Sequence, residues 1–129
     1  MQFEGLIPVL ICQQIENTLA FYQQALRYII IHKNLDAQGQ LHWAHLKSDN
    51  TTLMLQRHTG DHATQGQAGN IMLHYYTSDI LAQQRYMRAR GIVVGEIETT
   101  PYDMKQFHVT DPEGNLLSIG QAMGDDQAC

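Results

Sequence analysis

Seven histidines are the side chains of this sequence best suited to transfer a proton or bind a metal ion. Two of them, His74 and His108, stand in short apolar segments that are typical of strands. Such a pair could act as base and acid, or could hold a metal ion. No carboxylate accompanies the two at an equivalent position, so the favoured interpretation is polar lining of a binding surface, and the chemical role is kept as the alternative.

The other paired histidines indicate no site. His42 and His45 are three residues apart in a segment expected to be a strand, so their side chains point to opposite faces. His58 and His62 lie in a polar segment rich in Gly, Thr and Gln. We expect both pairs to be solvated rather than bound to a metal ion.

The two cysteines indicate a reduced compartment. Cys12 lies in an apolar segment and Cys129 at the end of the sequence, which does not make a disulfide framework. A nucleophilic Cys12 is the alternative, but apolar surroundings favour a small buried residue. The first positive charge is Arg27, and no apolar run reaches the length of a membrane helix. We therefore expect a cytoplasmic protein with no membrane partner.

Size and charge narrow the class of partner. The 129 residues are 43% hydrophobic, which is enough for one compact core without a disulfide or metal. The net charge is −5, and no basic run exists to contact a phosphate backbone, so we expect no nucleic-acid partner. The acidic balance favours a neutral or cationic small molecule.

The first half of the chain predicts one helix among four strands. Ile15, Leu19, Tyr22 and Leu26 recur at helical spacing and predict an amphipathic helix. An apolar segment before it predicts a strand buried on both faces, and three β-prone segments follow at hairpin spacing. The expected strands are residues 6–12, 28–32, 40–46 and 51–56.

The second half predicts the same order. After a polar linker, Asp79 can cap a helix that runs to Arg90, with Gly91 as its stop. The expected strands are residues 71–76, 92–97, 106–110 and 116–119.

An internal repeat supports this organisation. The segments 50–55 and 114–119 align at a spacing of 64 residues, from Asn50 to Gly114. We predict an α+β fold in which two βαβββ repeats share a curved mixed sheet with a concave cleft. The expected single domain, 1–129, comprises a unit at 3–57, a linker at 58–69, a second unit at 70–121 and a tail at 122–129.

Several motifs resemble a known family. They are Ile-Pro-Val-Leu at 7–10, Leu-Ala-Phe-Tyr at 19–22, Tyr-Asp-Met-Lys-Gln-Phe at 102–107 and Asp-Pro-Glu-Gly-Asn-Leu-Leu at 111–117. Together they resemble the glyoxalase, bleomycin resistance and extradiol dioxygenase superfamily, also called vicinal oxygen chelate. The resemblance implies the fold described above, and it is closest to metal-free bleomycin resistance-like proteins. The Asp-Pro-Glu-Gly-Asn turn specifies the fold and not the function.

The resemblance also implies where a metal would be held. Metal-dependent members place one His, Gln or Glu ligand in each of four strands, and the matching residues here are Ile7, Met54, Met72 and Ser118. None of them is an ordinary ligand of a hard or borderline divalent ion. We therefore expect no metal and no cofactor.

Two aromatic residues fall where the bleomycin resistance proteins line a groove with rings. Tyr102, directly after Pro101, is expected in the groove, whereas Trp43 fits the groove or the core equally well. Met54 and Met72 would give the cleft a deformable floor for a bulky apolar ligand, or would fill it.

These inferences lead to a functional hypothesis. The protein binds and sequesters a planar, neutral or cationic drug-like molecule, as a homodimer and without catalytic residues. Three side chains are expected to form hydrogen bonds with the ligand, and the remaining candidates to make apolar or stacking contacts. The expected binding residues are Ile7, Trp43, Met54, Met72, His74, Tyr102, His108 and Ser118. One alternative is an enzyme of lyase, isomerase or transferase type that uses His74 and His108, with or without a displaced metal. Another is a structural or regulatory dimer with a filled cleft.

Overall fold

The computed structural model describes residues 2–59 and 71–122, which fall into two compact units within residues 1–67 and 68–129. Each unit is described by itself. The greater part of the expected linker and of the expected tail, with His62 and Cys129, lies outside the described residues.

The first unit has the expected order of elements. Its strands and helix are β1 (Val9–Cys12), α1 (Ile15–Leu26), β2 (Ile29–Leu35), β3 (Leu41–Ser48) and β4 (Thr51–Arg57). They form one mixed sheet in the order β1-β4-β3-β2. The pairing of β1 with β4 is parallel and the other two pairings are antiparallel, because β2, β3 and β4 follow one another through short turns.

The first strand differs from its prediction. It begins at Val9 and not at residue 6, and Leu6 is 86% exposed. Pro8 has no N–H to donate, although its carbonyl still accepts from the Met54 N–H at 2.9 Å. The strand is also not buried on both faces, because it lies at a sheet edge and only Cys12 is fully buried. The expectation that Cys12 is a small buried residue is confirmed.

The second unit repeats this order. Its elements are β5 (Met72–Tyr76), α2 (Ile80–Ala89), β6 (Glu98–Thr99), β7 (Met104–Thr110) and β8 (Leu116–Ala122). The strand order in the sheet is β5-β8-β7-β6, with β5 parallel to β8.

The segment 92–97 is not a strand, contrary to the sequence prediction. Its backbone forms scattered bonds in place of a strand ladder: the Ile92 N–H donates to the Met87 carbonyl, the Gly95 carbonyl accepts from the Gln84 side chain, and the Gly95 N–H donates to the His108 carbonyl of β7 at 2.9 Å. Ladder pairing with β7 begins only at Glu98 and Thr99. Apolar composition alone did not distinguish this connection from a strand, because two of these bonds come from α2 and only one from β7.

Both helices are amphipathic and short. The α1 helix covers the predicted residues and buries Ile15 and Tyr22. The Asp79 carboxylate caps α2 by accepting from the Ala82 N–H at 3.1 Å, and Gly91 follows the helix with a φ of 79°. Neither helix is long and apolar enough to cross a membrane, in the part of the chain that the structure describes.

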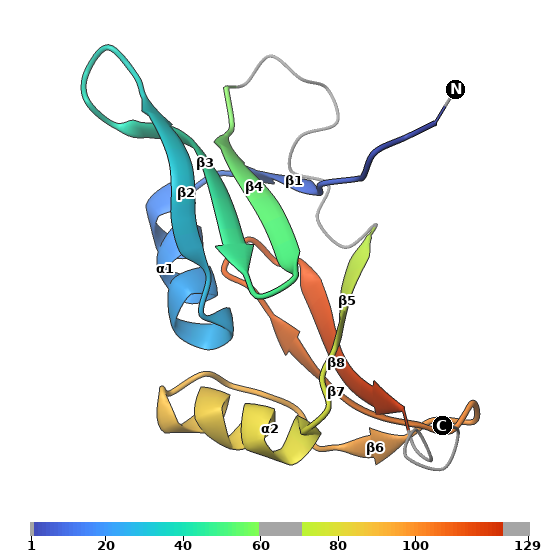
Figure 1. Cartoon of the computed structure of the whole chain (residues 1–129). Coiled ribbons are helices and arrows are strands. Elements are labelled where there is room, and N and C mark those ends of the chain that lie inside the picture. The colour runs from blue at the N-terminus through green and yellow to red at the C-terminus, as the bar shows by residue number, and fades with distance from the viewer. Residues whose placement is uncertain (1, 60–70, 123–129) are drawn as a thin grey trace. The chain divides into compact units, whose positions relative to one another are not determined.

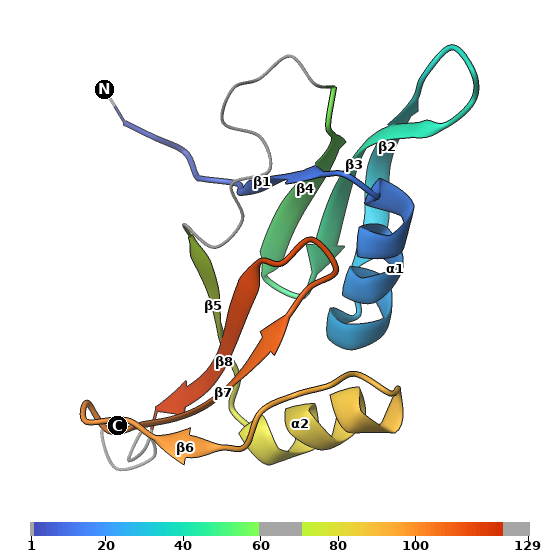
Figure 2. The same cartoon turned by 180° about the vertical axis from the view of Figure 1, so that it is seen from behind.

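Each helix packs on one face of its own sheet. Figure 1 shows α1 against the sheet formed by β1 to β4, and Figure 2 shows α2 beside β7 and β8. The strand residues that face the helices form the two cores: Ala44, Leu46, Leu53 and Leu55 in the first unit, and Phe107, Val109, Leu117 and Ile119 in the second. The opposite face of each sheet carries no helix among the described elements. We call it the open face.

The α+β class and the two βαβββ repeats are confirmed. In place of one shared sheet, the described strands hydrogen-bond in two four-stranded mixed sheets. The predicted repeat also holds at the level of register. Met54 pairs with His45 and Val9, and Ser118, 64 residues after Met54, pairs with His108 and His74.

Candidate functional site

The open face of the second sheet carries a row of three polar side chains. In the registers of the three strands, Ser118 of β8 lies opposite His74 of β5 and His108 of β7. Because directly paired residues point to the same face, all three side chains lie on the open face. Ser118 is fully buried between the two larger residues, and both imidazoles are half-buried. This row brings together three of the residues singled out in the sequence.

The neighbouring row adds an amide and two phenols. Gln106 pairs with Gly120, which pairs in turn with Tyr76. The Gln106 Oε1 atom accepts long hydrogen bonds of 3.5 Å from the hydroxyls of Tyr102 and Ser118. Tyr76 and Tyr102 are 75% and 64% exposed. The face therefore combines neutral hydrogen-bonding groups with accessible rings. We call this set of residues the second-sheet site: His74, Tyr76, Tyr102, Gln106, His108 and Ser118.

The second-sheet site has an apolar margin. Met72, at the start of β5, pairs with Leu116 of β8 on the same face. Both side chains are exposed, at 47% and 37% respectively. Met72 therefore lies at the end of the open face and does not fill it.

His74 is held in an unusual position. Its ring meets that of Tyr76 edge-on, with centroids 4.7 Å apart. Its Nε2 atom is shielded from solvent and has no hydrogen-bond partner in the structure. A Cβ atom placed on Gly120 would lie 3.0 Å from this nitrogen and 2.8 Å from the Met104 methyl carbon. The His74 ring and the end of Met104 therefore approach one another over a strand position that has no side chain.

Sequence reasoning missed Gly120 and Met104. One signal was available, because a glycine inside a strand often marks a close approach of another group. Nothing in the sequence says which group approaches, since Met104 and His74 are brought there by strand pairing.

The first unit presents a different open face. Met54 is half-buried and pairs with Val9 and His45. Ile7 precedes β1, two residues before Val9, and is 39% exposed. Trp43 of β3 is two residues before His45 and pairs with Gln56. It therefore lies on the open face, outside the core beneath α1. This face mixes the apolar and aromatic side chains of Val9, Trp43 and Met54 with polar ones, among them His45, Lys47 and Gln56.

The environment of His45 differs from the solvated one that the sequence predicted. Its ring lies 6.2 Å from the Trp43 ring and 6.1 Å from the His32 ring, measured between centroids. The Nε2 atom of His45 is shielded from solvent and has no hydrogen-bond partner in the structure, and the residue is half-buried, whereas the sequence suggested a solvated side chain. The flanking rings on β2 and β3 cover it. His42 lies on the opposite face of β3, as expected from strand alternation.

The metal-ligand positions implied by the resemblance do not fit a hard or borderline divalent ion. Ile7 offers no donor, Met54 and Met72 offer thioethers, and Ser118 offers a hydroxyl already directed at Gln106. Within residues 2–59 and 71–122, no three His, Cys, Asp or Glu side chains gather closely enough to hold a metal ion.

Comparisons with known proteins agree with this fold. A model described as the Glyoxalase/Bleomycin resistance protein/Dioxygenase superfamily matches residues 7–119. The crystal structure of TioX from Micromonospora sp. ML1 aligns with a TM-score of 0.72 and 20% identity, over 92% of this chain and 100% of that one. A bleomycin-binding protein complexed with bleomycin aligns with a TM-score of 0.70 and 21% identity, over 92% and 98%.

A lactoylglutathione lyase from Agrobacterium tumefaciens aligns with a TM-score of 0.67 and 16% identity, over 94% of this chain and 96% of that one. No curated protein sequence matches. At these identities the likenesses establish the fold, and function has to be argued from the open faces.

Proposed function

Since this chain belongs to the Glyoxalase/Bleomycin resistance protein/Dioxygenase superfamily, we propose that it binds a planar, neutral or cationic small molecule on an open sheet face and sequesters it unchanged. One observation carries the proposal: the second-sheet site sets neutral hydrogen-bonding side chains beside exposed tyrosine rings. Aromatic rings bind flat ligands by stacking, and a few polar groups then fix the orientation of the ligand.

The polar part of the proposed site is His74 and His108, on either side of Ser118, with Met72 at its margin. Ser118 is fully buried and its hydroxyl donates to Gln106, so its part in the proposal is to position Gln106. Tyr102 supplies a ring that is fixed at its hydroxyl by Gln106. No Lys or Arg lies in the second-sheet site, and the chain carries a net charge of −5. An anionic ligand would therefore find no charge partner there, whereas a cation is attracted by the long-range field.

The open face of the first unit is a separate candidate surface in this proposal, and it offers apolar contacts to a ligand. Ile7 has a branched aliphatic side chain, Met54 has a flexible one, and Trp43 adds a large ring. Because Trp43 lies outside the helix-covered core, it is available for stacking.

Thermal shift and calorimetry with matched ligands test the proposal. We expect planar cationic or neutral heteroaromatics, bleomycin-like glycopeptides among them, to raise the melting temperature more than planar anions do. Tyr102→Ala should weaken the binding of the best ligand by about 1–3 kcal/mol, as for a ring at the centre of a binding surface. Tyr86→Ala is the matched control, because Tyr86 lies on α2 and stacks with Arg90 at 3.5 Å. Preferential binding of anions, or equal binding by the Tyr102→Ala variant, would contradict the assignment.

An enzymatic function is the second candidate, and it is favoured by the two imidazoles that flank Ser118. Such an enzyme would use His74 and His108 as base and acid in a lyase, isomerase or transferase reaction. Mass spectrometry of the ligand after prolonged incubation separates the two functions. Full recovery of the unchanged ligand supports sequestration. A product whose formation is lost in both the His74→Gln and the His108→Gln variants would establish the enzyme instead.

A further inference from the structure

We propose that the surface over Gly120 is a donor-selective subsite, in which the Nε2 atom of His74 accepts a hydrogen bond from an N–H group of the ligand. The inference rests on the proposed function, and it names the chemical feature that the ligand must carry. That feature is a primary amine, amidine or amino-heteroaromatic group.

The Nε2 atom of His74 is a polar atom without a partner. It is shielded from solvent and has no partner in the structure. Buried polar atoms without partners are uncommon, and an orphaned donor is rarer than an orphaned acceptor. A neutral imidazole can avoid the orphaned donor by carrying its proton on Nδ1, which leaves a lone pair on Nε2. The geometry therefore points to Nε2 as an unused acceptor.

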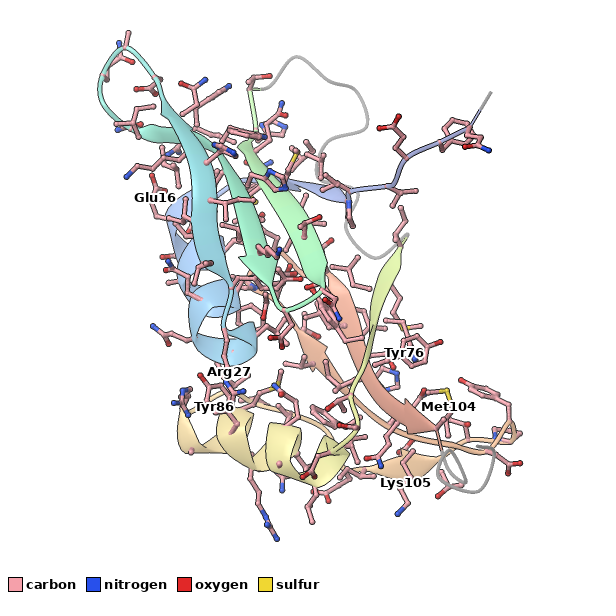
Figure 3. All side chains as sticks on the ribbon, in the orientation of Figure 1. Glu16, Arg27, Tyr76, Tyr86, Met104 and Lys105 are labelled. Carbon is pink, nitrogen blue, oxygen red and sulfur yellow. The ribbon has the colours of Figure 1, made fainter. Side chains whose placement is uncertain are left out.

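This acceptor lies over Gly120 of β8. Gly120 has no side chain, and an added Cβ atom would be 3.0 Å from Nε2 and 2.8 Å from the methyl carbon of Met104. In Figure 3, Tyr76 of β5 and Met104 of β7 extend from the two strands that flank β8, where Gly120 lies. The position over Gly120 is therefore taken by the Met104 methyl group and the edge of the His74 ring, and Tyr76 pairs with the same glycine.

A ligand can reach the Nε2 atom only if the Met104 side chain moves. Met104 is almost fully buried, but its side chain has three rotatable bonds and no polar atom that must be satisfied. A ligand amine can displace the methyl group at small cost and make the hydrogen bond that the free protein lacks. Tyr76, which pairs with Gly120 and is three-quarters exposed, offers a ring for the flat part of the ligand.

Two dyes test this subsite, because they share a planar cationic ring system and differ in their amino groups. Proflavine carries two primary amines. In acridine orange both are dimethylated, so its only remaining donor is the acridinium ring N–H, which the two dyes share. We expect proflavine to bind about tenfold more tightly in a fluorescence titration, which is the usual worth of one hydrogen bond to a buried acceptor. His74→Phe keeps a flat ring beside Tyr76 and removes the acceptor, so it should abolish this difference. His42→Phe, on the helix-covered face of β3, is the matched control and should preserve it.

A glycine pair tests the position independently of histidine. Gly120→Ala should remove the preference for proflavine, because the new methyl group takes the position from which a ligand amine would reach Nε2. In Gly95→Ala the added Cβ atom meets only the His108 backbone at 3.5 and 3.7 Å, an ordinary contact, so the preference should persist. If Gly120→Ala does not fold, Met104→Ala serves in its place: it removes the methyl group that lies beside Nε2 over Gly120, and proflavine should then bind about threefold more tightly.

A measurement without ligand completes the test. Two-bond proton–nitrogen correlation spectra distinguish the histidine tautomers, and loss of a signal in His74→Phe assigns the residue. We expect the Nδ1–H tautomer in the free protein. A protonated Nε2, or equal binding of the two dyes by the parent protein, would overturn the subsite and leave the proposed function standing. Failure of both dyes to bind would contradict the proposed function, and the subsite would fall with it.

Discussion

At the scale of single residues, donor chemistry separates these open faces from a metal centre. The side chains at the implied ligand positions are one aliphatic group, two thioethers and one hydroxyl: Ile7, Met54, Met72 and Ser118. A thioether is too soft and a serine hydroxyl too weak to bind a divalent ion such as Mn²⁺ or Zn²⁺ without imidazole or carboxylate partners. His74 pairs with Ser118, but it stands without an acidic neighbour in its row.

We expect removal of divalent ions to leave stability unchanged. A bound ion raises the melting temperature by mass action, so a protein that holds none has nothing to lose on chelation. The measurement is the melting temperature before and after treatment with a chelator, together with metal analysis of the purified protein. A drop of several degrees that Ni²⁺, Zn²⁺ or Mn²⁺ reverses would disprove the metal-free assignment.

At the scale of elements, the turn between β7 and β8 sets the register that builds the site. Asp111 is buried, and its Oδ1 atom accepts from the Glu113 and Asn115 N–H groups, both at 2.9 Å. Its Oδ2 atom accepts from the Asn115 side chain at 3.0 Å. This network closes the turn that places Ser118 opposite His108.

Asp111→Ala should therefore destabilise the protein by about 2–3 kcal/mol, because two partly buried backbone donors lose the buried carboxylate that accepts from them. Asp36 is the matched control. It makes the same pair of bonds, to the Gln38 and Gln40 N–H groups, in a more accessible turn. Asp36→Ala should cost only about 1 kcal/mol, since water can replace the carboxylate there. Urea unfolding compares the two variants. Equal losses in the free energy of unfolding would show that burial of the carboxylate does not determine its contribution.

One arginine ties three elements of the first unit together. The Arg57 Nε atom donates to the Leu41 carbonyl at 2.8 Å, and its terminal nitrogen pairs with Glu16 of α1. In the second unit Arg88 pairs with Glu96 at 3.1 Å, but both side chains are largely exposed.

Arg57→Ala is expected to lower the free energy of unfolding by about 1–2 kcal/mol, mostly through the orphaned carbonyl. Arg88→Ala should change it by less than about 0.5 kcal/mol, because exposed ion pairs are screened by solvent. The same unfolding assay checks both substitutions. If Arg88→Ala lowered the free energy of unfolding more than Arg57→Ala does, solvent exposure would not explain how much each ion pair contributes to stability.

At the scale of the whole molecule, the described sheets leave apolar surface and strand edges without partners. Val9 of β1 and Met72 of β5 are exposed on edge strands that each pair with only one neighbour. Such edges and faces invite association with a second copy of the chain.

We expect a homodimer in solution. Sedimentation equilibrium at micromolar concentration should give twice 14.7 kDa. Lys substituted for Val9 on the open face should shift the equilibrium toward the monomer, whereas Lys in place of the exposed α2 residue Leu81 should not. A monomer at every concentration would contradict the prediction.

Local pattern in the sequence was enough to predict two βαβββ units, the residues of α1, the cap of α2 and the repeat. Each of these depends on periodicity, capping or turn residues within a short stretch of chain. The prediction failed at residues 6–8 and 92–97, where a long-range backbone bond or an edge position decides whether an apolar segment is a strand. Composition carries no information about such partners.

The sequence also predicted that His74 and His108 line a binding surface. Only the tertiary structure decided which side chains meet on it. The parallel pairing of β5 with β8 sets His74 beside Ser118, and the antiparallel pairing of β7 with β8 brings Met104 toward Gly120. These contacts join residues tens of positions apart, through registers that are determined by the packing of whole strands. The buried nitrogen of His74 therefore became visible only when the sheet was assembled.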